Sequence, residues 1–134
     1  MAEAVDLEAD LFELAMSAEA QPLMDAVKKH IEDNVNPITE EFYALQNEKE
    51  DRWTWHPRQL ELLDGAKTKA KEAGLWNFFL PDADTGEGLS NLDYAYLAVE
   101  LGKSPLASES LNCSAPDTGN MEVLERVGTP EHNE

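Results

Sequence analysis

The sequence predicts an all-α fold, an orthogonal or irregular bundle of about five to six helices. Apolar residues recur at helical spacing, as at Leu23, Val27 and Ile31. Residues that start and stop helices also frame two later segments, Pro57 to Gly74 and Ser90 to Gly102. The length of 134 residues suits one domain with a hydrophobic core of its own.

The first 16 residues can be written as a short amphipathic helix that precedes a domain at 17–134. Its apolar set is Val5, Leu7, Leu11, Phe12 and Leu14. Good caps are missing, so a frayed extension, or a segment that orders only against a partner, is the alternative.

A long helical region is predicted from Ser17 to about Gln46. Its apolar stripe first includes Leu23, Val27, Ile31 and Val35, and it resumes at Ile38, Phe42 and Leu45. Pro37 interrupts the pattern, and a proline inside a helix removes an N–H and collides with the preceding turn. We therefore expect a kink or a break at Pro37.

The next helix is predicted from Pro57 to about Ala73. Pro57 suits a first helical turn and Gly74 suits a helix end. The expected inner face comprises Leu60, Leu63, Ala66, Ala70 and Ala73. Just before this helix, Trp53 and Trp55 are expected to lie over neighbouring helices as anchors, with stacking on a ligand as the alternative.

The most informative stretch is 74–103. A short apolar run ends at Pro81, and an acidic loop follows. Ser90 then starts a helix as its N-cap, and Asp93 completes a capping box. Gly102 is typical of the residue after a helix. This helix has little polar surface, so we expect it to be buried on several sides.

Two further helix starts follow. Residues 106–113 are mostly small and could be helical, and Ser114 is expected to cap a helix through Val127. If the chain instead stays helical across Ser114, Pro116 forces a kink. The Thr-Pro-Glu sequence at 129–131 predicts the start of one more helix, and the sequence stops shortly after it. The domain is therefore expected to be truncated at its C-terminal end.

Charge and composition exclude several classes of function. The chain has 28 Asp and Glu against 10 Lys and Arg, a net charge of −18, which repels nucleic acid and anionic membranes. Cys113 is the only cysteine, so no internal disulfide can form. No apolar run has the length of a membrane span, and the acidic N-terminus does not resemble a signal peptide. We expect a soluble intracellular protein, cytoplasmic by default, with mitochondrial or peroxisomal residence left open.

Apparent ligand motifs have simpler interpretations. The segment 86–91 nearly matches G-x-G-x-x-G, but Asn91 replaces the third glycine and the neighbouring acids repel a pyrophosphate. A calcium loop fails because Gly86 occupies the third ligand position. No metal site is predicted. Cys113 is expected to be a buried, inert thiol. The histidines are too scattered to form a metal site and are expected to be surface or capping residues: His30, His56 and His132.

Several motifs occur in a specific order: G-L-W, an apolar run ending in L-P, an acidic glycine loop, G-L-S-N-L-D-Y-A and V-E-L-G-K. With N-C-S-A-P-D-T-G-N-M-E-V-L and V-G-T-P-E after them, the series resembles the N-terminal helical domain of the acyl-CoA dehydrogenase family. The resemblance is strong over about Gly74–Glu131, weaker over Gln21–Ala73 and absent before that. One departure is the loop, which has Asp84-Thr85-Gly86-Glu87 where the family commonly has adjacent glycines.

The resemblance implies an enzyme that uses FAD to remove hydrogen from the α and β carbons of an acyl-CoA. It places the flavin between a β-rich middle domain and a C-terminal helical domain, and the catalytic base on the latter. This chain contains neither domain, so we assign no catalytic residue, and we expect no cofactor binding and no activity from the chain alone. The resemblance gives an acyl-channel role to Ser110, Leu111, Ser114 and Thr118, small or apolar residues that a continuous helix would bring to neighbouring positions.

Two other classes of function stay open. A stand-alone helical interaction module, which could form a homo-oligomer, would use apolar faces that this chain does not cover itself. A lipid or acyl carrier would use the same channel without catalysis.

Overall fold

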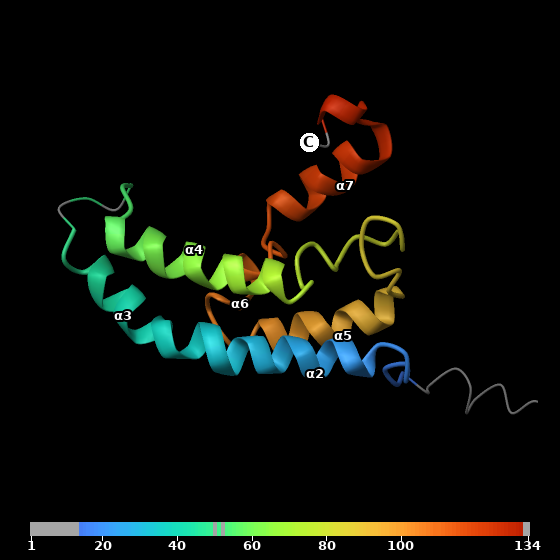
Figure 1. The fold of residues 1–134 in the computed structure, drawn as a ribbon, viewed down its shortest axis with the longest axis horizontal. Helices are drawn as coiled ribbons and strands as arrows, with labels where there is room; N and C mark the ends of the chain where they lie inside the picture. Colours follow the sequence, from blue (N-terminus) through green and yellow to red (C-terminus); the bar gives the residue numbers. More distant parts are fainter. Residues whose placement is uncertain (1–13, 50, 52, 133–134) are drawn as a thin grey trace, which may run out of the picture.

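The structure is a computed structural model that describes residues 14–49, 51 and 53–132. All regular elements of these residues are helical, which confirms the predicted fold class (Figure 1). The α-helices are α2 (Gln21–His30), α3 (Asn36–Gln46), α4 (Pro57–Glu72), α5 (Asn91–Leu101), α6 (Ala107–Ser110) and α7 (Asp117–Val127). Most of the predicted helix at 1–16 lies outside the described residues.

The first predicted helical region forms one bent rod. It begins at Gln21 rather than Ser17, and α2 and α3 are joined by the π-helix η1 (Ile31–Val35). The N–H of Asn36 donates to the carbonyl of Ile31, five residues back, and Pro37 follows in the first turn of α3. The wider π turn accommodates the proline, which has no N–H to donate. The kink expected at Pro37 is confirmed.

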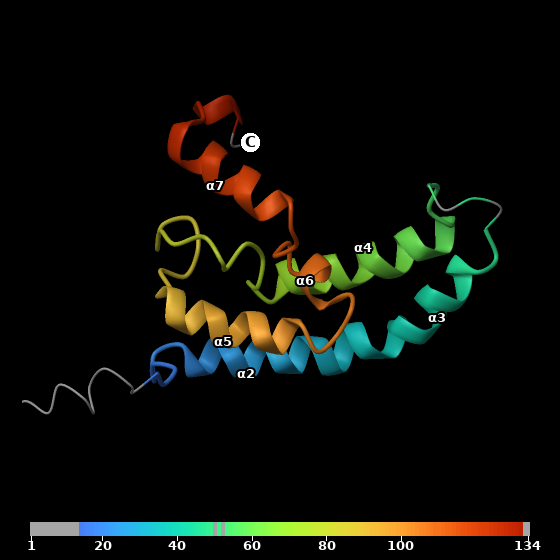
Figure 2. The same cartoon turned by 180° about the vertical axis from the view of Figure 1, so that it is seen from behind.

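The other helices pack along this rod (Figure 1). The chain turns back after α3, so that α4 runs beside α3, and α5 lies beside α2. The short α6 packs under α4. Figures 1 and 2 both show α7 standing off from the bundle at a steep angle. None of its residues is buried.

The core lies where these helices meet the segment between α4 and α5. Its fully buried members include Phe78, Leu97 and Leu111. On α4 the buried residues are Gln59, Leu62, Leu63, Ala66 and Ala70. The predictions for Leu60 and Ala73 are wrong, because both side chains are exposed.

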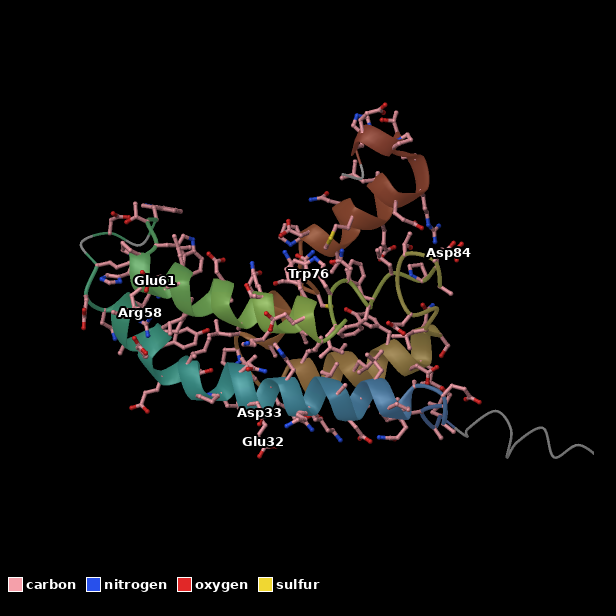
Figure 3. The ribbon with its side chains drawn as sticks, viewed as in Figure 1. Glu32, Asp33, Arg58, Glu61, Trp76 and Asp84 are labelled. Carbon is pink, nitrogen blue, oxygen red and sulfur yellow. The ribbon has the colours of Figure 1, made fainter. Side chains whose placement is uncertain are left out.

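Gln59 takes an inner position because all its polar atoms find partners. Its Nε2 donates to the Phe42 carbonyl at 2.8 Å, and its Oε1 accepts from the His56 N–H at 3.1 Å. His56 in turn caps α4 by accepting from the Arg58 N–H, as expected for a capping histidine. Figure 3 shows Arg58 beside Glu61 at this end of the bundle, where the two form an ion pair of 3.2 Å.

Of the two tryptophans before α4, Trp55 packs as the predicted anchor, whereas the ring of Trp53 is mostly exposed. Trp55 packs against Phe42, with ring centroids 5.7 Å apart. Trp53 is 79% exposed, so its ring is not buried under neighbouring helices.

Helix α5 begins as predicted but is less buried. The Ser90 hydroxyl accepts from the Asp93 N–H at 3.1 Å, which confirms the N-cap. Leu97 is buried, yet Tyr96 and Val99 are 39% and 66% exposed. The expectation of burial on several sides is therefore wrong for this chain. Gly102 also differs from expectation, since its φ of −65° is not left-handed.

His30 is buried, contrary to the surface or capping position expected for it. Its Nε2 lies 3.2 Å from the Ser110 hydroxyl, and its Nδ1 lies 3.4 Å from the Asn34 amide nitrogen. The Ser110 hydroxyl donates to the Ala107 carbonyl at 2.8 Å, so it accepts from a protonated Nε2. This network fits the neutral imidazole, and burial lowers the pKa of His30 from its ordinary value of 6.5.

Protonation of His30 should therefore destabilise the fold. Because its folded pKa is lower than its unfolded pKa, the unfolded state takes up the proton first, and the free energy of unfolding falls as pH falls below 6.5. We expect urea titrations between about pH 8 and pH 5 to show this loss. The His30→Gln variant should lose the His30 part of the slope, whereas His132→Gln, at an exposed site, should keep it. Identical slopes in wild type and His30→Gln would contradict the prediction.

Two glycine substitutions should have opposite effects. A Cβ on Gly86 would lie 2.1 Å from the Leu80 carbonyl oxygen, whereas a Cβ on Gly65, inside α4, would meet nothing within 4 Å. We expect Gly86→Ala to destabilise the domain by about 1–3 kcal/mol through overpacking. Gly65→Ala should stabilise it by about 1 kcal/mol, because alanine favours the helix. Thermal or urea unfolding measures the stability of each variant. If both substitutions change the stability in the same direction, the predicted difference between Gly86 and Gly65 is wrong.

Candidate functional site

The candidate site lies between α7 and the segment that joins α4 to α5. This segment carries the predicted apolar run, in which Phe78 is 1% and Phe79 is 7% exposed. The Tyr94 ring of α5 packs against both, with centroid distances of 6.3 and 6.4 Å. The aromatic rings form a rigid floor, because the run is held in the core on its other side.

A cavity of about 210 Å³ opens above this floor. The apolar part of its wall comes from Phe79, Pro81, Leu89 and Tyr94, and the polar part from Asn91, Thr118, Glu122 and Arg126. Burial raises the pKa of the Tyr94 phenol, with smaller contributions from Cys113 and Glu122. The phenol therefore stays protonated and neutral near neutral pH.

A second cavity lies against another side of α7. Its volume is about 370 Å³, and its lining is Asn77, Leu80, Thr85, Met121, Leu124, Glu125 and His132. Helix α7 thus contributes to the walls of two cavities, and Val123 and Val127 on it are 59% and 78% exposed. Much of its apolar surface is left in water.

The four predicted channel residues do not share one helix. Ser110 ends α6, and Leu111 and Ser110 are completely buried in the core. Asn112 has a φ of 59°, which ends the helical path, and α7 begins only at Asp117. The continuous helix that would have aligned them is not formed.

Ser114 lies three residues before α7, and Thr118 lies in its first turn. The Ser114 carbonyl, not its hydroxyl, accepts from the N–H groups of Asp117 and Thr118, at 3.1 and 3.3 Å. The predicted serine cap is therefore wrong, although the helix runs to Val127 as expected. Thr118 lines the 210 Å³ cavity.

A pair of asparagines forms the joint below α7. Asn77 and Asn112 both have left-handed backbones, with φ of 61° and 59°. The Asn112 Nδ2 donates to the Asn77 Oδ1 at 2.6 Å, and the Asn77 N–H donates to the Leu111 carbonyl at 3.4 Å. Sequence reasoning missed this joint. The available signal was weak, since asparagine tolerates left-handed backbone but does not require it.

The remaining candidates stay structural. Cys113 is buried as expected, and burial raises the pKa of its thiol to about 12, so the reactive thiolate is suppressed. In the acidic loop, the Asp82 Oδ1 accepts from the Asp84 N–H at 2.8 Å, which is ordinary turn geometry. Within the described residues, no three His, Cys, Asp or Glu side chains gather to hold a metal ion. The helices described there are also too short or too polar to cross a membrane.

Known proteins provide an independent comparison. The family model for "Acyl-CoA dehydrogenase, N-terminal domain" matches residues 17–134. Acyl-CoA dehydrogenase family member 10 of Mus musculus is 45% identical over 120 residues, covering 81% of this chain and 11% of its own length. Probable acyl-CoA dehydrogenase FadE2 of Mycobacterium tuberculosis is 52% identical over 71 residues, covering 52% of this chain and 17% of its own length. The chain thus spans a small part of the curated relatives it matches.

A solved structure agrees with these matches. The putative acyl-CoA dehydrogenase from Mycobacterium abscessus superposes with a TM-score of 0.74 at 43% sequence identity. The superposition covers 87% of this chain and 30% of that one. Fold, sequence and the order of motifs therefore agree, and the chain belongs to the acyl-CoA dehydrogenase family, of which it carries the N-terminal domain.

Proposed function

We propose that this chain forms one wall of the acyl-chain channel in an FAD-dependent acyl-CoA dehydrogenase, which introduces a double bond between the α and β carbons of its substrate. The observation that carries the proposal is the cavity beside α7. Thr118 shares its lining with Phe79, Leu89 and Tyr94. Half of the lining residues are apolar and half are polar, and the apolar half suits contact with a hydrocarbon chain.

The four channel residues have different roles in this proposal. Thr118 faces the acyl chain, and Ser114 fixes the first turn of α7 through its carbonyl. Ser110 and Leu111, which are fully buried, support the wall from behind. The small size of Ser110 and its hydrogen bond with His30 keep α6 close to the rod.

The chain's own residues do not fit a flavin. In the described part of the chain, every buried polar side-chain atom already has a hydrogen-bond partner. None of these atoms is left for a ligand to bind. The turn at Gly86, which superficially resembles a phosphate-binding loop, is filled by the Leu80 carbonyl. The net charge of −18 also disfavours the phosphates of FAD and coenzyme A. We therefore assign flavin binding and the catalytic base to other segments of the enzyme.

An interaction module is the second candidate, and one observation favours it. Val99, Val123 and Val127 are apolar residues exposed on two helices, as at a protein interface. In an acyl-CoA dehydrogenase such surfaces would contact the other domains. A stand-alone module would instead self-associate, which light scattering detects as an oligomer of the isolated chain.

The isolated chain should bind no flavin and oxidise no acyl-CoA, because the groups that would do so lie elsewhere in the proposal. We expect a colourless purified protein, no visible absorbance after incubation with FAD and removal of free ligand, and no dye reduction by acyl-CoAs. Stoichiometric flavin in the purified chain would refute this assignment. The Mycobacterium abscessus relative, expressed in parallel, provides the full-length comparison.

Thr118 should control the length of acyl chain that the enzyme accepts. Residues 17–134 would replace the matching part of a full-length relative whose dye reduction by acyl-CoAs has first been measured. In this chimera, we expect Thr118→Phe to lower kcat/KM for long acyl-CoAs by about tenfold or more, with a smaller effect on short ones. Thr68→Phe on the exposed side of α4 is the matched control and should change neither. An equal loss for all chain lengths would rule out a channel role.

A further inference from the structure

Helix α5 has an open apolar face that is separate from the proposed channel. The side chains of Ala95, Tyr96 and Val99 are exposed, and Leu92 is half-buried. Together with Leu14 they line a shallow groove of about 240 Å³. An apolar groove of this kind is unfavourable in water unless something covers it.

The described chain begins in this groove. Leu14 is 66% exposed, and the Tyr96 hydroxyl donates a hydrogen bond to its carbonyl. Three residues later, the Ser17 N–H donates to the Asp93 Oδ1 at 2.7 Å. Figure 1 shows the start of α2 next to the first turn of α5.

These two contacts define a direction. Going back from Ser17 to Leu14 moves three residues along the chain, and the partner moves three residues forward on α5, from Asp93 to Tyr96. The N-terminal segment therefore enters the groove antiparallel to α5. The same step once more brings Leu11 opposite Val99.

The sequence before Leu14 matches the groove. On a helical projection, one half of the circumference holds the apolar residues Val5, Leu7, Leu11 and Phe12. The opposite side holds four of the five acids, Glu3, Asp6, Asp10 and Glu13, and the fifth, Glu8, projects among the apolar residues. In the register that places Leu11 opposite Val99, residues 9–13 lie along the last turns of α5, and residues 1–8 extend past its end at Leu101.

We propose that residues 1–13 form an amphipathic helix antiparallel to α5, whose last turns pack on the open face of α5 with Leu11 on Val99. The occupant is a segment of this chain because it is already attached at the groove. A tether of this kind gives an effective concentration on the order of millimolar, which a separate partner would rarely reach. Antiparallel packing also sets opposite ends of the two helix dipoles side by side.

Disulfide trapping tests the register directly. The pair Leu11→Cys and Val99→Cys, in a Cys113→Ala background, should form an intramolecular disulfide under mild oxidation. The matched pair Ala9→Cys and Val99→Cys should not, because position 9 lies on the other side of the projected helix. Non-reducing electrophoresis separates cross-linked monomers from cross-linked dimers, and peptide mass mapping identifies the bond.

Each outcome decides the proposal. Cross-linking of Leu11→Cys alone, within monomers, supports it. Equal cross-linking of both pairs, or none, overturns it, because the segment then has no fixed register on α5. Cross-linking between two chains also overturns it and makes a second copy the occupant. None of these results depends on flavin or substrate, so they are separate from the test of the channel.

A charge substitution gives a second measurement. Leu11→Asp should expose the face of α5. The fluorescence of an added apolar dye should then rise at least to about the level seen when residues 1–13 are deleted. Ala9→Asp adds the same charge on the polar side and should leave the fluorescence unchanged. Circular dichroism confirms that each variant is folded. If Leu11→Asp behaves like Ala9→Asp, the proposal is wrong even where a disulfide can form.

Discussion

The domain depends on the packing of one face of α5 against the apolar run that follows α4. Leu97 and Leu101 on α5 and Phe78 in the run are among its most buried side chains. Burial of such residues contributes about 1.5–3 kcal/mol each, compared with about 0.5–1.5 kcal/mol for a hydrogen bond between neutral groups. The run also joins α6 through the bond from Asn77 to the Leu111 carbonyl. The apolar run therefore positions both α4, which precedes it in the chain, and α6 relative to α5.

Local signals in the sequence were sufficient for the elements that carry explicit start and stop residues. Ser90 caps α5, and α4 runs from Pro57 to Glu72, ending just before the left-handed Gly74, because caps and turns depend on neighbouring residues only. Burial was harder to predict, since it depends on partners far along the chain. Gln59 replaces Leu60 in the core because the Phe42 carbonyl lies within its reach, and no local pattern contains that fact.

The candidate site shows the same division between local and distant information. The apolar run and Thr118 were identifiable from residue order and family resemblance, but the cavity that joins them was not. Its shape depends on the position of α7, and the joint below α7 has left-handed backbone at Asn77 and Asn112. Two residues 35 positions apart must adopt this rare conformation together, and their side chains then bond at 2.6 Å. Periodicity cannot reveal such a coincidence, and it suggested a continuous helix instead.

The apolar residues that remain exposed are not distributed at random. On α7, Val123 and Val127 project from a helix that has no buried residue, so burial within the described chain does not account for its sequence. On α5 the open stripe lies beside the described start of the chain, at Leu14. A helix exposed for partners needs a rigid base, and the bonded asparagines supply one for α7. The cavities along α7 therefore lie between the buried aromatic floor and a helix whose outer face is exposed, and this arrangement is the basis of the channel wall that we propose.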